Sequence, residues 1–420
     1  MNCMQTQMTF AATAAILGLS SLLHAADFHA SPAGAGSKDG SSKANAVSAD
    51  GIAGLFNDTM QAGDRLLLGA GVYNASLSLT KGGTAEKPKI IEGPAGAEAT
   101  ATFQSTWTVE KPDKGATAIA LGAGLTGVTL KNLHISHYCF AIRAQPSPTP
   151  RTNLTFDGIS MEQMRHGFYL SDCDSMLFSN CTMKRYSKHG FRFDQGCDKV
   201  VLKGCVADCS EGDLDWETKT ELFTFGYIMN NSGAPNTGFL FENCVAKNNM
   251  KSNQGSLKYT NGDGFVGEAN TRDVIFKNCQ SIRNQDGGFD LKIPGVKLID
   301  CIAIGHRRDF RLWKEGTLEN CFGGWSTTGF WGNGGPVTAT NCMFVGERRG
   351  GVEMEGKAAA PITLKGCVIT TDSSQKEFQA TIGKVELGDT KIVPTEQVKK
   401  DARYIKAVEL GKALKVGPAS

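Results

Sequence analysis

The sequence predicts an all-β solenoid of the parallel β-helix type, and two regularly spaced features carry this prediction. Phenylalanines preceded by Gly or Asp recur at a near-constant interval, at Phe168, Phe191, Phe265, Phe289, Phe310 and Phe330. Cysteines preceded by Asn, Gly or Asp keep the same interval, at Cys181, Cys205, Cys244, Cys279, Cys301, Cys321, Cys342 and Cys367. A period of about 20–25 residues is typical of solenoids whose repeats bury their apolar faces on one another.

The segments between these marks have the composition of strands. Residues 199–205 and 273–279 are rich in β-branched side chains and contain Asn, Gly or Asp at their ends, which indicates short strands joined by tight turns. A leucine-rich repeat would instead show leucine at fixed positions and a helical stretch. Because coils of a β-helix stack about 4.8 Å apart, residues one period apart should be lateral neighbours.

The N-terminus has the pattern of an export signal. Residues 1–26 contain no Lys, Arg, Asp or Glu, and residues 11–23 form an apolar run followed by small residues at Ala25 and Ala26. The run is too short to span a membrane. We therefore predict a signal peptide over residues 1–25, no membrane span, and a secreted or periplasmic protein.

The following segment is predicted to begin one β-helix domain over residues 27–390. Residues 27–72 should form its N-terminal cap, in which residues 48–61 have the pattern of a short amphipathic helix. The apolar face of this helix comprises Ile52, Leu55, Phe56 and Met60.

Coils are expected from about Tyr73 to Leu387. Loops should interrupt them near residues 145–151, 217–236 and 248–260. The tail, residues 391–420, should form a helix over residues 396–410 that caps the last coil and covers its open edge.

Composition and charge limit the classes of partner and of metal site that the protein is expected to have. Lys and Arg total 44 against 42 Asp and Glu, a formal net charge of +2, so neither nucleic acid nor an anionic membrane is favoured as a partner. We also expect a monomer. The thirteen cysteines lack a CxxC pair, which argues against a metal held by cysteine. We interpret the regularly spaced ones as small buried hydrophobes rather than a disulfide framework, because hydrogen bonds between coils already fix the chain.

The repeat also predicts which side chains share an outer surface. Side chains alternate across a strand, so if each Phe points inward, the residues one and three positions later point outward. At the first of these positions, with Leu214 taken as the inward residue of one coil, lie Tyr169, Arg192, Asp215, Val266, Asp290, Arg311 and Trp331. At the second lie Ser171, Asp194, Glu217, Glu268, Lys292, Trp313 and Asn333. This mixture of acids, bases and aromatics predicts a functional groove.

Three carboxylates should meet in this groove, because Asp263, Asp286 and Asp290 lie on adjacent coils. Such anions repel one another unless a cation lies between them. Hard oxygen ligands among flexible glycines suit Ca²⁺, and the alternative is a solvated acidic rim without an ion.

A cation is expected one coil further along. Arg311 occupies the position of Asp290 on the next coil, either as a surface ion pair or as the base that removes a proton next to a carboxylate. Lys292 is the rival base, because lysine loses its proton more readily than arginine. Trp313 and Trp331 flank this cation and would either stack on sugar faces or pack under a loop.

The stretch Asn261-Gly262-Asp263-Gly264-Phe265, with Asp286-Gly287-Gly288-Phe289-Asp290-Leu291 on the next coil, resembles the family 9 polysaccharide lyases. These are calcium-dependent, pectate-lyase-type enzymes with a right-handed parallel β-helix. The resemblance covers about residues 243–333. It implies that Asp263, Asp286 and Asp290 occupy three of the four calcium-ligand positions, that Gly287 stands at the fourth, and that Arg311 stands at the position of the catalytic lysine.

The resemblance implies an exported polysaccharide lyase that cleaves an acidic polysaccharide, a polyuronate, by β-elimination. Calcium would neutralise the uronate carboxylate, and Arg311 or Lys292 would take the neighbouring proton. Residues expected to contact substrate are Trp313, Trp331, Glu268 and Asp215. Three alternatives stay open: glycoside hydrolysis by paired carboxylates such as Asp215 and Asp290, epimerisation, and a catalytically inactive β-helix that binds glycans or serves as a scaffold.

Overall fold

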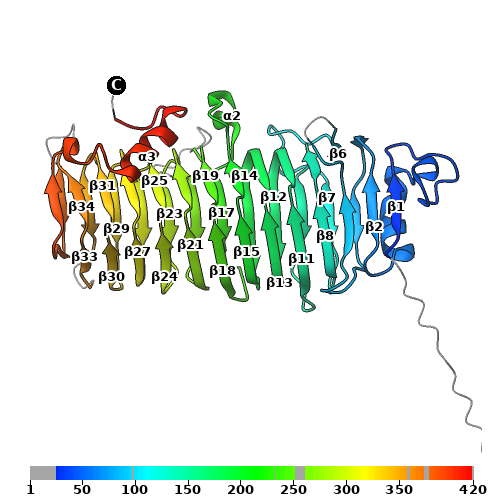
Figure 1. Ribbon diagram of the computed structural model, residues 1–420, viewed down its shortest axis with the longest axis horizontal. Helices are drawn as coiled ribbons and strands as arrows, with labels where there is room; N and C mark the ends of the chain where they lie inside the picture. The colour runs from blue at the N-terminus through cyan, green and yellow to red at the C-terminus, as the bar shows by residue number, and fades with distance from the viewer. Residues whose placement is uncertain are drawn as a thin grey trace, which may run out of the picture.

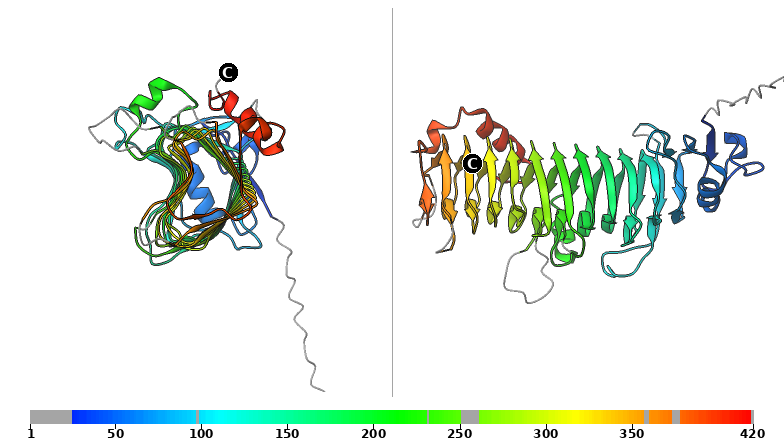
Figure 2. Two further views of the ribbon diagram at one scale, coloured as in Figure 1. Left: turned by 90° about the vertical axis from the view of Figure 1, so that its left-hand side faces the viewer. Right: turned by 90° about the horizontal axis from the view of Figure 1, so that it is seen from below.

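The structure is a computed structural model that describes residues 25–96, 99–230, 232–250, 261–356, 360–372 and 378–418. The chain winds into one elongated solenoid whose coils stack side by side along its long axis (Figure 1). Viewed along that axis, the coils superpose into one closed outline (Figure 2). The predicted all-β fold is confirmed. The signal peptide predicted for residues 1–25 lies outside the described residues except for Ala25.

Three faces of parallel strands, here named A, B and C, run along the solenoid. Face A contains β1 (Asp27–Ala30), β2 (Arg65–Leu68), β5 (Lys89–Glu92), β8 (Thr126–Lys131), β11 (Arg151–Asp157), β13 (Cys173–Ser179), β15 (Asp198–Lys203), β18 (Asn236–Glu242), β21 (Thr271–Lys277), β24 (Val296–Ile299), β27 (Gly316–Glu319), β30 (Val337–Thr340), β33 (Ile362–Lys365) and β36 (Val385–Glu386). Face B contains β4 (Leu77–Leu79), β7 (Thr117–Leu121), β10 (Phe140–Ala144), β12 (Ser160–Ser171), β14 (Thr182–Gln195), β17 (Phe225–Met229), β20 (Asp263–Gly267), β23 (Gly287–Leu291), β26 (Arg308–Leu312), β29 (Thr328–Gly332), β32 (Gly350–Met354) and β35 (Gln379–Ile382).

Face C shares the long strands β12 and β14 with face B, because these two strands continue around the corner between the faces. Its other strands are β3 (Gly71–Tyr73), β6 (Ala101–Gln104), β9 (Leu133–Ser136), β16 (Val206–Asp208), β19 (Val245–Lys247), β22 (Gln280–Ile282), β25 (Ile302–Ile304), β28 (Phe322–Gly324), β31 (Met343–Val345), β34 (Val368–Thr370) and β37 (Lys391–Val393). No helix among the described residues is long and apolar enough to cross a membrane.

The inward position of face B carries a stack of aromatic rings, as predicted. The ring centroids of Phe265 and Phe289 lie 4.7 Å apart, and those of Phe289 and Phe310 lie 5.3 Å apart. In the coil between Phe191 and Phe265, the inward residue is Tyr227, whose ring stacks on both neighbours at 4.7 and 4.8 Å. Such offset-stacked rings bury a large apolar area and add favourable ring–ring contacts.

Tyr227 corrects one part of the predicted register. The sequence predicts Leu214 at the inward position and Asp215 in the outward row. Both residues instead belong to helix α2 (Leu214–Lys219). Asp213 begins this helix because its side chain accepts hydrogen bonds from the first backbone N–H groups. The segment between β16 and β17 is therefore an insertion outside the coil, and Ile228 takes the outward position that had been given to Asp215.

The cysteine positions form a second internal ladder, as predicted. The twelve cysteines among the described residues are free and buried. The residue before each regularly spaced cysteine has a positive φ between 50° and 62°; these residues are Asn180, Gly204, Asn243, Asn278, Asp300, Asn320, Asn341 and Gly366. Glycine, asparagine and aspartate adopt this left-handed conformation most readily, which explains their recurrence before the cysteines.

The two ends of the solenoid differ in how they match the prediction. At the N-terminal end, a helical segment over residues 49–59, with α1 (Ile52–Gly54) at its centre, buries the predicted apolar face. At the C-terminal end, helix α3 (Ala402–Lys412) folds back and packs on β25 and β28 of face C (Figure 1). The prediction that the tail caps the last coil is therefore wrong. The apolar surface formed by Ile304, Phe322 and their neighbours on face C attracts the helix instead.

Between β12 and β32, one coil departs from the rule that glycine precedes the inward residue of face B. A Cβ at Gly264 or Gly288 would lie within 2.7 or 2.5 Å of the backbone of the next coil, which explains the glycines. Asp309 occupies this position in β26 and is completely buried. Its Oδ1 lies 2.7 Å from His306 Nδ1 and accepts a hydrogen bond of 2.5 Å from the Ser326 hydroxyl.

Asp309 shares this interior with a second buried carboxyl group. Glu347 Oε2 accepts a hydrogen bond of 3.0 Å from the Ser326 N–H. Burial and the charge of Glu347 raise the pKa of Asp309 well above its ordinary value, and burial raises the pKa of Glu347 from 4.5 to about 8. Two adjacent buried carboxyl groups resist simultaneous ionisation, so this pair retains a proton at neutral pH. Burial also lowers the pKa of His306 from 6.5 to about 3, so its imidazole is neutral.

The free energy of unfolding should fall as the pH rises from about 6.5 to about 8. Over this range the folded protein binds a proton at the pair that the unfolded chain has already released, because the ordinary pKa of glutamate is 4.5. His306 contributes the opposite slope only below pH 6.5, where the unfolded chain protonates first. Urea denaturation of Glu347→Gln should show a flatter pH profile. Glu319→Gln, which changes an exposed side chain of β27, is the control. A pH slope of Glu347→Gln equal to that of the wild type would contradict the raised pKa assigned to the Asp309–Glu347 pair.

Candidate functional site

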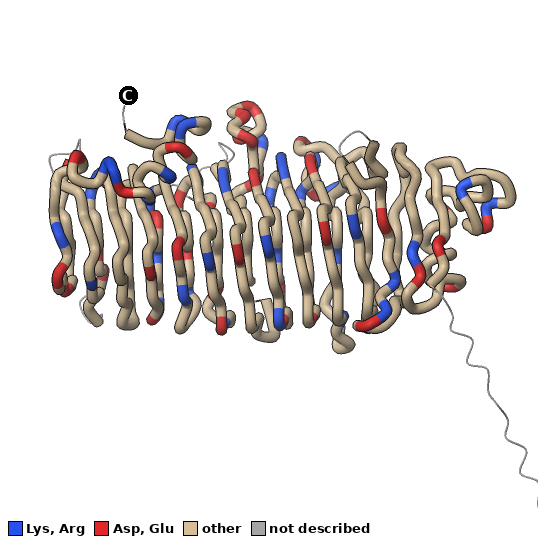
Figure 3. The backbone as a smooth tube through the Cα atoms, viewed as in Figure 1, with Lys and Arg blue, Asp and Glu red and all other residues tan. Residues whose placement is uncertain are grey.

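A groove on face B brings most of the predicted site residues together. It has a volume of about 690 Å³ and crosses β14, β17, β20, β23 and β26. Its charged lining residues are Lys188, Arg192, Asp263, Glu268, Asp286, Asp290, Lys292, Arg307 and Arg311. Charges of both signs are interspersed along the whole solenoid (Figure 3), so the groove is distinguished by the close approach of its charges rather than by a field of one sign.

Three aspartates lie at the centre of the groove, as predicted. Asp263, Asp286 and Asp290 are 2%, 6% and 6% exposed. Burial, with the charges of Asp290 and Asp286, raises the pKa of Asp263 well above its ordinary value. Burial also raises the pKa of Asp290, against the opposing effect of the nearby Arg311 charge. The cluster therefore holds its negative charge at a high cost in solvation.

The backbone of Gly287 compensates part of this charge. Its N–H donates a hydrogen bond of 2.5 Å to Asp263 Oδ1. A Cβ at this position would lie 2.8 Å from the same oxygen, so a side chain would push the aspartate away. A backbone donor thus stands at the fourth calcium-ligand position that the resemblance to the lyases implied for Gly287.

The Arg311 guanidinium interacts with the other two aspartates of the cluster, Asp286 and Asp290. Its Nη1 lies 3.3 Å from Asp286 Oδ2, and its Nε lies 3.6 Å from Asp290 Oδ1. Its Cζ lies 4.5 and 5.1 Å from the ring centroids of Trp313 and Trp331, within the range of cation–π attraction. Two ion pairs and two aromatic rings therefore hold this guanidinium in one place.

Lys292 is the more accessible of the two predicted bases. Its side chain is 33% exposed, against 16% for Arg311. Its Nζ lies 2.8 Å from Glu268 Oε1 and 4.0 Å from Asp290 Oδ2. The indole N–H of Trp313 donates to the other Asp290 oxygen at 2.7 Å, which fixes that carboxylate beside the amine. An amine, an acid and an aromatic ring therefore meet at the C-terminal end of β23.

Two predicted substrate contacts lie elsewhere. Trp331 is 1% exposed, its indole N–H donates to Glu355 at 2.8 Å, and Arg308 lies over its ring at 4.9 Å. A buried ring has no free face for a sugar, so the expectation of stacking on Trp331 is wrong. Asp215 is on helix α2 and pairs with Lys219 at 2.8 Å, outside the residues that line the groove. Its predicted place in the outward row is wrong for the reason given above.

Sequence reasoning missed several cations of the groove. Lys188 and Arg307 line it, and each stands three residues before an inward aromatic, as Asp286 does. Reading this third position along the repeat would have found them. His189 also lines the groove; burial lowers its pKa well below the ordinary value, and its Nδ1 has no hydrogen-bond partner among the described residues.

The residues at the centre of the groove do not fit a calcium ion in this arrangement. Among the described residues, no group of three or more His, Cys, Asp or Glu side chains is placed so that it could hold a metal ion. The Arg311 guanidinium contacts both Asp286 and Asp290, where a metal would need their oxygens. The calcium site predicted from the sequence and the observed arrangement therefore disagree, and a calcium titration distinguishes them.

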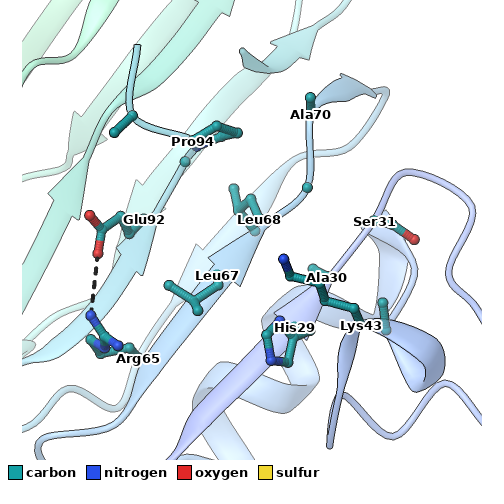
Figure 4. A pocket seen from close by; sticks show the side chains of 14 residues that line it. His29, Ala30, Ser31, Lys43, Arg65, Leu67, Leu68, Ala70, Glu92 and Pro94 are labelled. Atoms are coloured by element: carbon teal, nitrogen blue, oxygen red, sulfur yellow. Dashed lines mark ion pairs between the residues drawn. The ribbon is translucent and has the colours of Figure 1, made fainter. Parts of the chain in front are cut away.

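A second hollow lies at the N-terminal end of the solenoid (Figure 4). It has a volume of about 570 Å³ and is lined mainly by β1, β2 and the segment after β5. Glu92 is the one acid among the described residues that line it, and it pairs with Arg65 at 3.9 Å. This hollow therefore lacks the convergent acids and bases that mark the groove on face B.

The family described as "Right handed beta helix region" matches residues 101–322, which is about half of the chain and includes most of the groove. The chain belongs to this family. Among curated proteins, none matches this right-handed β-helix protein significantly.

Solved structures share its fold at low sequence identity. Pectate lyase Pel9A is 13% identical with a TM-score of 0.50, over 87% of this chain and 81% of that one. The GH136 lacto-N-biosidase from Eubacterium ramulus is 11% identical with a TM-score of 0.52, over 88% and 68%. The A-module of the Azotobacter vinelandii mannuronan C-5 epimerase AlgE6 is 13% identical with a TM-score of 0.51, over 79% and 89%. These likenesses establish the fold.

Calorimetric titration should detect no calcium binding by the wild-type protein, because the Arg311 guanidinium already lies against the oxygens of Asp286 and Asp290. Arg311→Ala should gain calcium affinity, with a dissociation constant of about 10⁻⁴–10⁻³ M, because the guanidinium then no longer occupies the carboxylate oxygens of Asp286 and Asp290. Arg272→Ala, on exposed β21, serves as the control and should bind no calcium. Tight binding by the wild type that Arg311→Ala abolishes would contradict this role of Arg311.

Proposed function

We propose that this protein is a polysaccharide lyase that cleaves an acidic polysaccharide, a polyuronate, by β-elimination. The observation that carries the proposal is the Lys292 amine beside Asp290, in a groove rich in guanidinium groups. β-Elimination from a uronate needs a base for the C5 proton and cations for the carboxylate, and the groove contains both. The names of the three structures with this fold, a lyase, a biosidase and an epimerase, support a carbohydrate-active enzyme. Action outside the cytoplasm agrees with the signal peptide predicted over residues 1–25.

The charge of the groove suits an anionic chain. Among the described residues, five Lys or Arg side chains line it against four Asp or Glu side chains. The raised pKa of Asp263 reduces the negative charge further. Arg307 is the cation best placed for a substrate carboxylate: its side chain is 46% exposed, and it lies 3.5 Å from Asp286. Arginine binds carboxylates through paired N–H groups, which gives orientation as well as affinity.

Arg311 and Lys292, the two cations nearest Asp290, are assigned different roles in the reaction. Arg311 is held by two carboxylates and two rings, so we assign it to charge compensation rather than to proton transfer. Lys292 is more exposed, and an amine loses its proton more readily than a guanidinium. We therefore assign the base to Lys292.

The elimination then proceeds as follows in terms of bonds. Once it has released its own proton to solvent, the Lys292 amine takes the C5 proton, and the electron pair of that C–H bond becomes the C4=C5 double bond. The C4–O glycosidic bond breaks, and the departing oxygen takes a proton from water or from a groove acid such as Asp263. Arg307 stabilises the charge that develops on the uronate carboxylate, where a preorganised cation acts most strongly.

Hydrolysis is a second candidate, and the raised pKa of Asp263 favours it. A carboxyl group that keeps its proton can act as a general acid. Asp286, which pairs with Arg307 and Arg311, would be the second carboxyl group of the hydrolytic pair. Reducing ends without an unsaturated product would select hydrolysis over elimination.

The test is a screen of the purified protein on polygalacturonate, polymannuronate and polyguluronate. Elimination should give both new reducing ends and the ultraviolet absorbance of an unsaturated uronate. Lys292→Ala should lower kcat by about 10²–10⁴-fold, the usual contribution of a general base. Lys297→Ala, an exposed lysine of β24 on face A, is the matched control and should keep full activity. Cleavage of none of the three polymers would contradict the lyase and favour a glycan-binding or scaffold protein.

A further inference from the structure

The outward row of face B continues beyond the groove toward the N-terminal end of the solenoid. Arg143 of β10 pairs in register with Tyr169 of β12, and Tyr169 pairs with Arg192 of β14. The row then continues through two apolar residues, Ile228 and Val266, to Asp290. Arg143 and Tyr169 lie outside the lining of the groove, and the proposed elimination does not use them.

Aromatic rings hold the Arg143 guanidinium in place. Its Cζ lies 4.2 Å from the ring centroid of Phe140 and 5.9 Å from that of Tyr169. Tyr169 is itself fixed, because it stands edge-on to Phe140 and to His166, at 5.5 and 5.2 Å between ring centroids. A guanidinium supported in this way loses little further freedom when it binds a ligand.

The two arginines beside Tyr169 differ in their partners. Arg192 donates to Asp194 at 2.8 Å, and Asp194 also accepts hydrogen bonds from Asn230 and Ser232. Arg143 has no such carboxylate: its Nε is buried without a hydrogen-bond partner in the part of the chain that the structure describes. The Arg143 charge therefore has no carboxylate partner among the described residues, and its guanidinium can pair with a carboxylate of an external ligand.

We propose that Arg143 forms a distal subsite that binds the carboxylate of a second uronate in the same polysaccharide chain. This inference rests on the proposed function, because it takes the polyuronate in the groove as its ligand. Arg143 lies five coil steps from Asp290, about 24 Å at about 4.8 Å per coil. A chain must therefore be several sugars long to occupy both places, and the enzyme should prefer long chains to short ones.

The length of the bound oligosaccharide distinguishes a distal subsite at Arg143 from a purely structural role of this residue. A structural arginine would affect short and long ligands alike, through stability. A distal subsite affects long ligands alone, and it affects their binding rather than kcat. Comparison of uronate dodecamers with uronate trimers, taken from the polymer that the protein cleaves best, provides this contrast.

Calorimetry should show that Arg143→Ala weakens dodecamer binding about tenfold, as expected for one hydrogen-bonded charged pair, with trimer binding unchanged. Arg143→Gln, which keeps most of the side-chain length, should behave in the same way and covers the case in which the alanine variant unfolds. Arg272→Ala, on exposed β21 of face A, is the control and should match the wild type for both ligands.

Three results would overturn the inference, and they are distinguishable. Equal weakening of trimer and dodecamer would make Arg143 a structural residue, and no effect on either would remove the subsite; in both cases the proposed function stands. Failure of the wild type to bind any uronate oligomer from the three polymers would remove the proposed function, and the subsite with it.

Discussion

The aromatic core and the outer row of face B both depend on the in-register stacking of parallel coils. Aromatic rings at the inward position of face B lie 4.7–5.3 Å apart from coil to coil between Phe168 and Phe310. Because side chains alternate along a strand, the residue after each ring is directed outward and lies beside its counterpart on the next coil. One position per period therefore determines a continuous outer row, and the residues at that position determine its chemistry.

The same constraint brings like charges together, which the fold must compensate. Asp263, Asp286 and Asp290 are nearly fully buried, and an uncompensated buried charge costs several kcal/mol. The Gly287 N–H and the Arg311 guanidinium satisfy them from within the protein. Arg311 therefore has a structural role, because it offsets the charge of buried aspartates. In the proposed function, the more exposed Lys292 amine is then the base and the outer arginines are contacts for an anionic ligand.

Local pattern predicted the fold and the centre of the groove, because both follow from the repeat. The Phe and Cys positions and the aspartate cluster were found from spacing alone. The place of Asp215 was not, because the insertion around α2 shifts the register and Tyr227 lacks the Gly-Phe mark. The burial of Trp331 and the return of α3 along face C depend on contacts between distant segments. The calcium expectation depended on charge alone, and spacing does not reveal that a guanidinium contacts the same carboxylates.

The central claim is that the outward row of face B is the track of an acidic polysaccharide. A crystal structure of the Lys292→Ala variant with a uronate dodecamer tests it most directly. The account predicts a sugar chain that crosses β20, β23 and β26, with one carboxylate on Arg307 and another on Arg143. A chain bound in the hollow beside β1 and β2, or one whose carboxylates contact neither arginine, would contradict it.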